Sequence, residues 1–317
     1  MNKMLQQTGH SEPVGSTPQQ VGGLSTSGPV LSDAAFARIT AIAHREAGLF
    51  IADGKAAMVR TRLARRLRAL KLSDFESYCS YVESSEGRDE LGMMISALTT
   101  NVSHFFREDH HFETLKKTIL PGLIEKARQG EKIRIWSAGC SNGQEPYSIA
   151  MTLLESNIPH NADIKILASD IDPNVVAHGR EGLYPSTMAT GLDEAHRDKY
   201  FTREIMDADE AWRAKPELKS LISFRVLNLL QPWPMHGKFD VIFCRNVVIY
   251  FDAPTQDKLW ERFANILKPS GWLFLGHSER VSHGAMSKFK NSGMTTYQRN
   301  GTGSAQAAGT PQAPARN

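Results

Sequence analysis

The stretch IRIWSAGCSNGQEPYS, residues 133–148, decides the fold of this chain. Its apolar start predicts a buried strand, and the sequence after Gly143 predicts a helix. Gly139 and Gly143 are expected to let the backbone turn tightly and approach a ligand where a Cβ atom would collide. A strand, a glycine turn and a helix N-terminus are together typical of nucleotide-binding sites. The G-x-x-x-G spacing alone is a weak signal, because a plain strand-to-helix connection has the same pattern.

A second apolar strand, IKILASD at 164–170, ends on Asp170. In nucleotide-binding α/β folds an acid at this place accepts hydrogen bonds from ribose hydroxyls. Asp170 or Asp172 can instead cap the helix that Pro173 is expected to begin. The two roles are compatible if the two aspartates divide them.

Strand and helix patterns alternate from about residue 133 to residue 276. Two more strands are predicted, FDVIFCRN at 239–246 and LKPSGWLFLG at 267–276. Such alternation predicts an α/β fold with a doubly wound, mostly parallel sheet. Ligands of these sheets bind at the carboxyl ends of the strands, where the 239–246 segment carries polar residues. The sequence therefore favours a site for a nucleotide-type cofactor.

The composition is typical of a soluble globular protein, with 317 residues of which 41% are hydrophobic. This length suffices for about two domains. No apolar run approaches the roughly 18 residues of a membrane helix, and the N-terminus lacks the apolar core of a secretion signal. Cys79, Cys140 and Cys244 are widely separated, which indicates neither a disulfide framework nor a zinc site. We therefore expect a cytoplasmic protein without a bound metal.

Changes in composition predict the domain organisation. Residues 1–29 and 300–317 are rich in small and polar residues and in proline, and we expect both tails to be disordered. Residues 30–100 show helical patterns and predict a small all-helical domain. Residues 101–130 are expected to form a linker and a first helix that close the cofactor site. The α/β domain is then expected at 131–299.

The rhythm of strands and helices is interrupted at about 190–224. KYFTRE at 199–204 and EAWRAK at 210–215 predict short strands of a small, inserted antiparallel β-subdomain. The segment can equally be a packing insertion without a binding role.

The helical domain contains a basic stretch between Lys55 and Ser73, with seven Lys or Arg residues and no acid. Apolar residues at helical spacing are expected to face the core, and Arg62, Arg65 and Arg66 are expected to project from the other side. The stretch is either a solvated helix face or a docking surface for an acidic protein helix or nucleic acid. It lacks the interleaved aromatic residues that stack on bases, which favours a protein. The candidate docking residues are Arg60, Arg62, Arg65, Arg66 and Arg68.

The segment LTTNVSHFFRE, residues 98–108, joins the two domains. Its polar residues and Arg107 suit a linker folded over the mouth of a cleft. Alternatively, Asn101 or Ser103 caps a helix, and the two following phenylalanines anchor it in the core. His110 and His111 are neighbours on a presumed helix, so we expect them to point in different directions and to bind no metal.

Taken together, these motifs resemble the bacterial chemotaxis receptor methyltransferases, which move a methyl group from S-adenosylmethionine to glutamate side chains of chemoreceptors. The matching stretches follow the family's order over roughly residues 31–298. They are LTTNVSHFFRE (98–108), WSAGCSNGQEPYSIA (136–150), ASDID (168–172), NLL (228–230), FDVIFCRNVVIYFD (239–252) and GHSE (276–279). The EPYSIA and CRNVVIYFD strings are far more specific than the glycine turn.

The resemblance implies S-adenosyl-L-methionine as cofactor and S-adenosyl-L-homocysteine as product. It implies that Arg107 and Tyr250 face the reacting carboxylate as catalytic residues. Ser103 stands where the family pattern has Thr, a change that keeps the hydroxyl. The cofactor contacts that the resemblance implies come from Asn101, Ser103, Arg107, Glu145, Asp170, Asn228, Leu229, Arg245 and Asn246.

The resemblance also implies the partners. They are the cytoplasmic helical domain of chemotaxis receptors, methylated for sensory adaptation, and in some members a receptor C-terminal peptide that the β-subdomain adds as a strand. Neither nucleic acid nor direct membrane insertion is expected. Two alternatives stay open, a methyltransferase of nucleic acid or a small molecule, and a non-catalytic adaptor that binds the cofactor.

Overall fold

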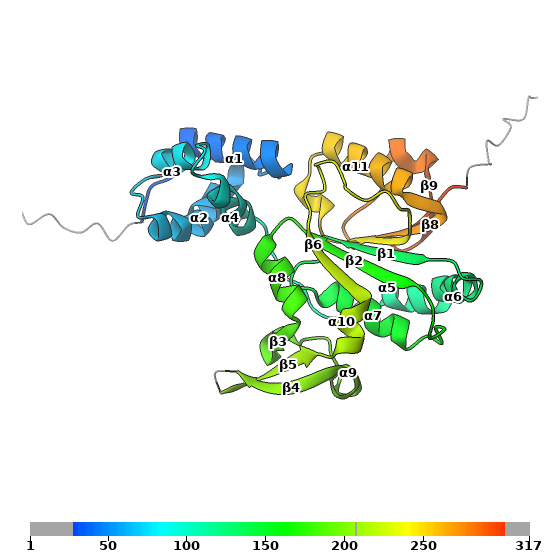
Figure 1. Cartoon of the computed structure of the whole chain (residues 1–317). Coiled ribbons are helices and arrows are strands. Elements are labelled where there is room, and N and C mark those ends of the chain that lie inside the picture. Colours follow the sequence, from blue (N-terminus) through cyan, green and yellow to red (C-terminus); the bar gives the residue numbers. More distant parts are fainter. Residues whose placement is uncertain (1–27, 207, 302–317) are drawn as a thin grey trace, which may run out of the picture.

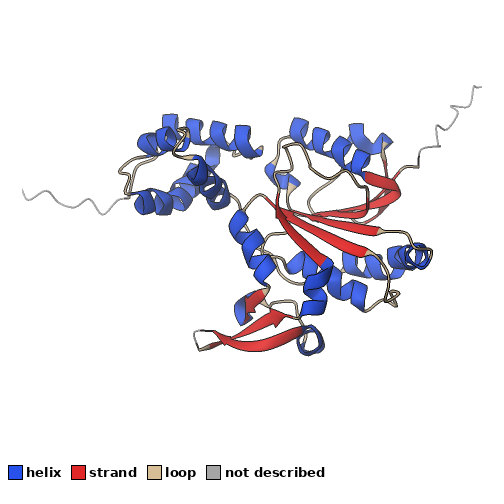
Figure 2. Ribbon diagram, viewed as in Figure 1, coloured by secondary structure: helices blue, strands red, loops and turns tan. Residues whose placement is uncertain are grey.

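The computed structural model describes residues 28–206 and 208–301 of the chain. Nearly all of the two tails that we expect to be disordered lies outside these residues. The described chain forms a helical N-terminal domain, a central sheet covered by helices, and a small separate sheet (Figures 1 and 2). The predicted α/β fold with a helical domain and an antiparallel insertion is therefore confirmed.

The N-terminal domain packs its helices around one apolar core. Ser32 caps the first helix by accepting a 3.1 Å hydrogen bond from the Ala35 N–H, and the helix ends at Gly48 with a left-handed φ of 67°. Val59, Leu63 and Leu67 place one face of the second helix in the core, as their spacing predicts. The elements are α1 (Asp33–Ala47), η1 (Asp53–Lys55), α2 (Ala56–Leu70), α3 (Phe75–Val82) and α4 (Arg88–Leu98).

The arginines of α2 do not all project into solvent. Arg62 Nη1 donates to the carbonyl oxygen of Leu98 at 2.6 Å, at the end of α4. Arg66 donates to both oxygens of Glu90, at 3.0 and 2.5 Å, and the Tyr78 hydroxyl donates to the same carboxylate at 2.8 Å. The expected outward direction is therefore wrong for Arg62 and Arg66, which hold the domain together. The exposed candidate docking residues are Arg60, Arg65 and Arg68.

Within the described residues the main sheet has seven strands in the order β6-β2-β1-β7-β8-β10-β9. The strands from β6 to β8 are parallel, and β10 pairs antiparallel with both neighbours. The chain builds outward from β1 in one direction and then returns to add β7 on its other side. This reversal opens a crevice at the carboxyl ends of β1 and β7, where open sheets bind ligands. The strands are β1 (Ile133–Ala138), β2 (Ile164–Asp170), β6 (Ile222–Val226), β7 (Phe239–Cys244), β8 (Leu267–Leu275), β9 (Phe289–Gly293) and β10 (Thr296–Arg299).

Helices bury both faces of this sheet, as a parallel sheet requires. Ile135 and its neighbour Trp136 are fully buried but belong to different core clusters, because successive side chains of a strand point to opposite faces. In Figure 1, α11 lies above the sheet, and α5, α6 and α7 lie below it. The covering elements are α5 (His110–Thr114), η2 (Leu115–Ile119), α6 (Leu120–Arg128), α7 (Gln144–Leu154), α8 (Pro173–Glu181), α10 (Pro216–Leu221), α11 (Ala253–Ile266) and η5 (His283–Ser287).

The inserted β-subdomain differs from its predicted bounds of 190–224. It begins earlier, at β3, and it ends before β6, which pairs with β2 of the main sheet. Lys199 and Tyr200 end a helix and are not part of a strand. The subdomain is a three-stranded antiparallel sheet in the order β3-β5-β4 (bottom of Figure 1). Its elements are β3 (Leu183–Pro185), η3 (Ser186–Met188), α9 (Glu194–Tyr200), β4 (Phe201–Met206) and β5 (Asp209–Ala214).

Backbone contacts attach the helical domain to the α/β domain. The Phe50 N–H donates to the Tyr250 carbonyl oxygen at 2.7 Å, and Leu49 forms an isolated antiparallel bridge with Phe251. The chain after α1 is thereby fixed against η4 (Val248–Tyr250). Among the described residues, no helix has both the length and the apolar character needed to cross a membrane.

Glu90→Ala should destabilise the helical domain by about 3 kcal/mol, because it leaves Arg66 without its partner. We expect the low end of the range for buried pairs, since the Arg66 side chain is still 22% exposed. Urea denaturation followed by circular dichroism measures the change. The exposed Glu86→Ala is the control and should stay within about 0.5 kcal/mol of the parent. Equal stabilities for the two variants would contradict the role of this ion pair.

Candidate active site

A cavity of about 350 Å³ lies at the carboxyl ends of β1, β2 and β7. The linker 99–107 and the end of α1 form its other walls. The structure brings every predicted cofactor and catalytic residue to this cavity, although their contacts with a ligand stay predictions. These lining residues are Asn101, Ser103, Arg107, Glu145, Asp170, Asn228, Leu229, Arg245, Asn246 and Tyr250.

The two glycines of the turn after β1 have different reasons to lack a side chain. Gly139 lines the cavity with φ +89°, and a Cβ atom there would lie 2.3 Å from the Val247 side chain. Gly143 begins α7 with φ +93°, and its Cβ would meet Tyr184 at 2.8 Å and Gly179 at 2.9 Å. Gly139 thus lines the cavity, although its close approach to a ligand stays a prediction, whereas Gly143 serves the packing of α7 and does not line the cavity.

Of the two aspartates after β2, one caps a helix and the other lines the cavity, where its contact with a ribose stays a prediction. Asp172 caps α8 by accepting from the Asn174 N–H at 2.8 Å, and it also accepts from the Asn101 amide at 2.9 Å. Asp170 lines the cavity and accepts the Ser141 N–H at 2.8 Å. Burial raises the pKa of Asp170, and hydrogen bonds from backbone N–H groups act in the opposite direction. The cavity therefore has one carboxylate at the position that suits ribose hydroxyls.

The linker interpretation fits residues 98–108 better than the helix-cap interpretation. Neither Asn101 nor Ser103 begins a helix, because α5 starts only at His110 with Asp109 as its cap. The core-anchor part of the alternative is correct for Phe105, which is 1% exposed. The linker is thus fixed at Phe105, and the residues before it line the cavity.

The two terminal nitrogen atoms of the Arg245 guanidinium are paired within the protein. Its nitrogen atoms lie 3.1 Å from Glu145 and 3.2 Å from Glu108, and one of them also donates to the Arg107 carbonyl oxygen. Glu145 accepts a second hydrogen bond from the Ser137 hydroxyl at 2.7 Å. Burial raises the pKa of Glu145, and the charge of Arg245 acts in the opposite direction.

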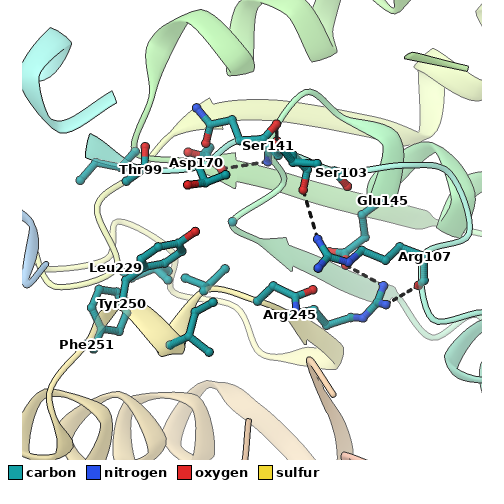
Figure 3. A pocket seen from close by; sticks show the side chains of 18 of the residues that line it. Thr99, Ser103, Arg107, Ser141, Glu145, Asp170, Leu229, Arg245, Tyr250 and Phe251 are labelled. Atoms are coloured by element: carbon teal, nitrogen blue, oxygen red, sulfur yellow. Dashed lines mark hydrogen bonds and ion pairs between the residues drawn. The ribbon is translucent and has the colours of Figure 1, made fainter. Parts of the chain in front are cut away.

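Arg107 is paired differently. Its Nη1 donates to the Val102 carbonyl oxygen at 3.1 Å, but among the described residues it has no carboxylate partner. Figure 3 shows Arg107 and Tyr250 on opposite sides of the cavity. A half-buried guanidinium without a counter-ion is suited to bind an anion that enters the cavity.

Asn228 and Glu279 have structural roles that the sequence did not reveal. The Asn228 amide donates to the Glu46 carbonyl oxygen at 2.8 Å, so it joins the cavity wall to α1. Glu279 belongs to the GHSE string, whose role could not be read from the residues alone. Its carboxylate lies beneath the loop that carries Asn246 and Tyr250 and accepts hydrogen bonds from that loop's backbone.

The two adjacent histidines do not point in different directions, and this expectation is wrong. The rings of His110 and His111 lie 4.1 Å apart, and with Glu108 they place three potential metal ligands within 4.8 Å of one another. However, Arg245 lies 3.2 Å from the same Glu108, and His111 already bonds Thr295 at 2.9 Å. The neighbouring positive charge disfavours a cation, and the absence of a metal stays a prediction.

Gly139→Ala should weaken binding of S-adenosyl-L-homocysteine by at least about tenfold, because its Cβ displaces Val247 in the cavity wall. Gly130→Ala is the matched control, since Gly130 has φ +84° but no atom within 4 Å of its Cβ position. Both variants should lose about 1 kcal/mol of stability through backbone strain. Titration calorimetry measures the affinities, and equal affinities for the two variants would show that Gly139 is not needed at the cavity.

Comparison with known proteins assigns the chain to a family. The family model described as "CheR methyltransferase, all-alpha domain" matches residues 34–99, and "CheR methyltransferase, SAM binding domain" matches residues 101–298. A probable chemotaxis protein methyltransferase of Rhizobium etli is 48% identical over 257 residues, 80% of this chain and 96% of that protein. The chemotaxis protein methyltransferase of Escherichia coli K12 is 42% identical over 269 residues, 84% of this chain and 91% of that protein. The chain therefore belongs to the CheR family of S-adenosylmethionine-dependent methyltransferases.

Proposed function

We propose that the protein transfers a methyl group from S-adenosylmethionine to glutamate side-chain carboxylates of chemotaxis receptors, forming methyl esters. The observation that carries the proposal is the guanidinium of Arg107, which lines the cavity opposite Tyr250 and has no carboxylate partner among the described residues. A planar guanidinium can bind an incoming carboxylate at two points. The relatives named as chemotaxis protein methyltransferases support a chemotaxis protein as acceptor.

The residues at the cavity fit the cofactor. Asp170 offers a carboxylate for ribose hydroxyls, and Ile171 and Leu229 offer apolar surface for a base. The absence of a side chain at Gly139 allows Val247 to pack at the cavity wall, because a Cβ atom there would collide with the Val247 side chain. When bound, S-adenosylmethionine supplies a methyl group on a sulfonium sulfur, so the reactivity belongs to the cofactor.

The side chains of the cavity have a positioning task. The side chain of a solvent-exposed glutamate has a pKa of about 4.3, so a glutamate acceptor is already ionised at neutral pH and needs no general base. Arg107 and the Tyr250 hydroxyl hold the carboxylate so that one oxygen faces the methyl group. Such positioning can lower a barrier by up to about 7–11 kcal/mol. The linker and the end of α1 exclude competing water.

The mouth of the cavity suits a protein acceptor. Val102 and Ile249 line the cavity but are 73% and 52% exposed, so they lie at its rim. Phe50, 62% exposed, is fixed next to the segment that carries Ile249 by the hydrogen bond from its N–H to the Tyr250 carbonyl oxygen. An apolar rim of this kind is typical of a surface that another protein covers. The proposed acceptor is the helical cytoplasmic domain of a receptor, and the proposed reaction takes place in the cytoplasm.

The β-subdomain is a candidate second contact with the receptor. β4 is an edge strand of its sheet, and Ile205 on this strand is 66% exposed. An exposed edge is the physical requirement for adding a peptide as a further strand. Capture of a receptor C-terminal peptide is therefore part of the proposal.

One assay tests the reaction type. The protein is incubated with methyl-labelled S-adenosylmethionine and receptor cytoplasmic fragments, and the labelled product is treated with alkali. We expect labelled methanol, because base hydrolyses a carboxyl methyl ester. Label that resists alkali would indicate methylation of nitrogen and overturn the proposal, and a lack of transfer would indicate an adaptor.

Tyr250→Phe and Asp170→Ala should separate turnover from cofactor binding. Loss of the Tyr250 hydroxyl should lower kcat about tenfold with little change in cofactor affinity, the effect of about one hydrogen bond in the transition state. Asp170→Ala should do the reverse and weaken cofactor affinity about 10- to 100-fold. Steady-state rates and titration calorimetry measure the two effects. If both variants lost only cofactor affinity, the role proposed for Tyr250 would be wrong.

Charge reversal on α2 should weaken receptor binding. Arg65→Glu/Arg68→Glu changes two exposed residues and should raise the KM for receptor fragments about tenfold at low salt, and less in 0.5 M salt. The affinity for S-adenosyl-L-homocysteine should not change. Arg128→Glu/Lys132→Glu, with the same change in charge at exposed positions beyond α2, is the matched control. An equal rise in KM in both double variants would show that the effect is not specific to α2.

A further inference from the structure

Glu279 has an unusual environment for a buried carboxylate. Its side chain is 3% exposed, and among the described residues it has no cationic partner. Oε2 accepts two backbone N–H groups and Oε1 accepts three. The donors are Gly276 (2.6 Å), Asn246 (2.8 Å), Val247 (2.8 Å), Val248 (2.8 Å) and Ile249 (3.2 Å).

The five donors come from two segments at the cavity. Four of them are consecutive residues of the loop 246–249, which follows β7, and the fifth directly follows β8. Asn246 has a left-handed φ of 58°, which is uncommon for a residue other than glycine and requires support from its surroundings. Gly276 lies directly against it, since a Cβ atom at Gly276 would be 2.7 Å from the Asn246 nitrogen.

We propose that Glu279 is a positioning residue for the reaction, which holds Asn246 and Tyr250 at opposite ends of one loop in their places at the cavity. Glu279 itself does not line the cavity, so it acts through these two residues. The part that concerns Tyr250 rests on the proposed function. The part that concerns Asn246 and the cofactor does not.

The N–H donors around Glu279 favour an ionised carboxylate and act against burial, which raises the pKa of this group. Every hydrogen bond to Glu279 comes from an N–H donor, and four N–H groups that point in one direction are otherwise a typical anion site. In Glu279→Gln the side chain keeps its size, but its NH2 group now faces backbone N–H groups. Both groups are donors, so no hydrogen bond forms between them. At least part of the loop then loses its anchor, and Asn246 and Tyr250 shift.

The control has to separate positioning from stability. Asp240 lies near the opposite end of β7, is 2% exposed, and accepts hydrogen bonds from the Arg134 N–H at 2.9 Å and from Lys268 at 2.8 Å. It does not line the cavity. Asp240→Asn should therefore lower the melting temperature and leave kcat unchanged below it.

The full-length protein carries Glu279→Gln, Tyr250→Phe, or both, and is assayed with receptor fragments at saturating cofactor. We expect Glu279→Gln to lower kcat about tenfold and to weaken S-adenosyl-L-homocysteine affinity about fivefold. In the Tyr250→Phe background the same change should lower kcat less than about threefold, because the group that it positions is already gone. Should Glu279→Gln not fold, Glu279→Asp keeps the charge with a shorter reach and should show the same coupling.

Two results would overturn the proposal. One is a double variant in which the fold-loss of kcat equals the product of the losses in the two single variants. Such independent effects would mean that Glu279 does not act through Tyr250. The other is an activity loss in Asp240→Asn that matches Glu279→Gln at equal loss of stability. If Tyr250→Phe alone leaves turnover unchanged, the proposed function of Tyr250 fails, and Glu279 is tested by cofactor affinity alone. Unchanged affinity of Glu279→Gln for S-adenosyl-L-homocysteine would then refute the positioning role of Glu279.

Discussion

The cavity depends on one buried cation, the guanidinium of Arg245 at the end of β7. Its side chain is 2% exposed and lies 3.1 Å from Glu145 and 3.2 Å from Glu108. These carboxylates come from α7 and from the segment that follows the linker, so the ion pairs join three parts of the chain that are distant in sequence. Loss of one partner from a buried pair costs about 3–5 kcal/mol, because a charge stays without compensation. Arg245 therefore helps, together with the buried Phe105, to keep the linker in the wall of the cavity.

The helical domain is part of the same arrangement. Phe50 bonds the Tyr250 carbonyl, and Asn228 bonds the Glu46 carbonyl, so the end of α1 is attached to two loops of the α/β domain. The domain that carries the exposed arginines of α2 thus also supplies Leu49 to the cavity wall. A partner that binds the helical domain therefore contacts a part of the protein that is attached directly to the site of the proposed reaction.

The sequence patterns were sufficient for the central strands and for Asp170, because these strands carry apolar runs and their carboxyl ends meet. Asn101, Ser103, Arg107 and Glu145 do not lie on strands, and only the family resemblance pointed to them as cofactor contacts. The sequence patterns failed for β6 (Ile222–Val226), a short edge strand with alternating exposure that lacks the continuous apolar run of β7. They also failed for Arg62 and Arg66. Their partners lie 36 and 24 residues away, and helical periodicity contains no information about such distant contacts.

The difference between paired and unpaired charges also limits the chemistry of the cavity. Glu145 is paired with Arg245, and Asp170 is the carboxylate proposed for the ribose hydroxyls, so neither has the proposed role of a general base. An amine acceptor is protonated at neutral pH and would need such a base. A carboxylate needs none, and it supplies the negative charge that Arg107 lacks within the described chain. The proposed esterification of a carboxylate is therefore consistent with a cavity in which no general base has been assigned.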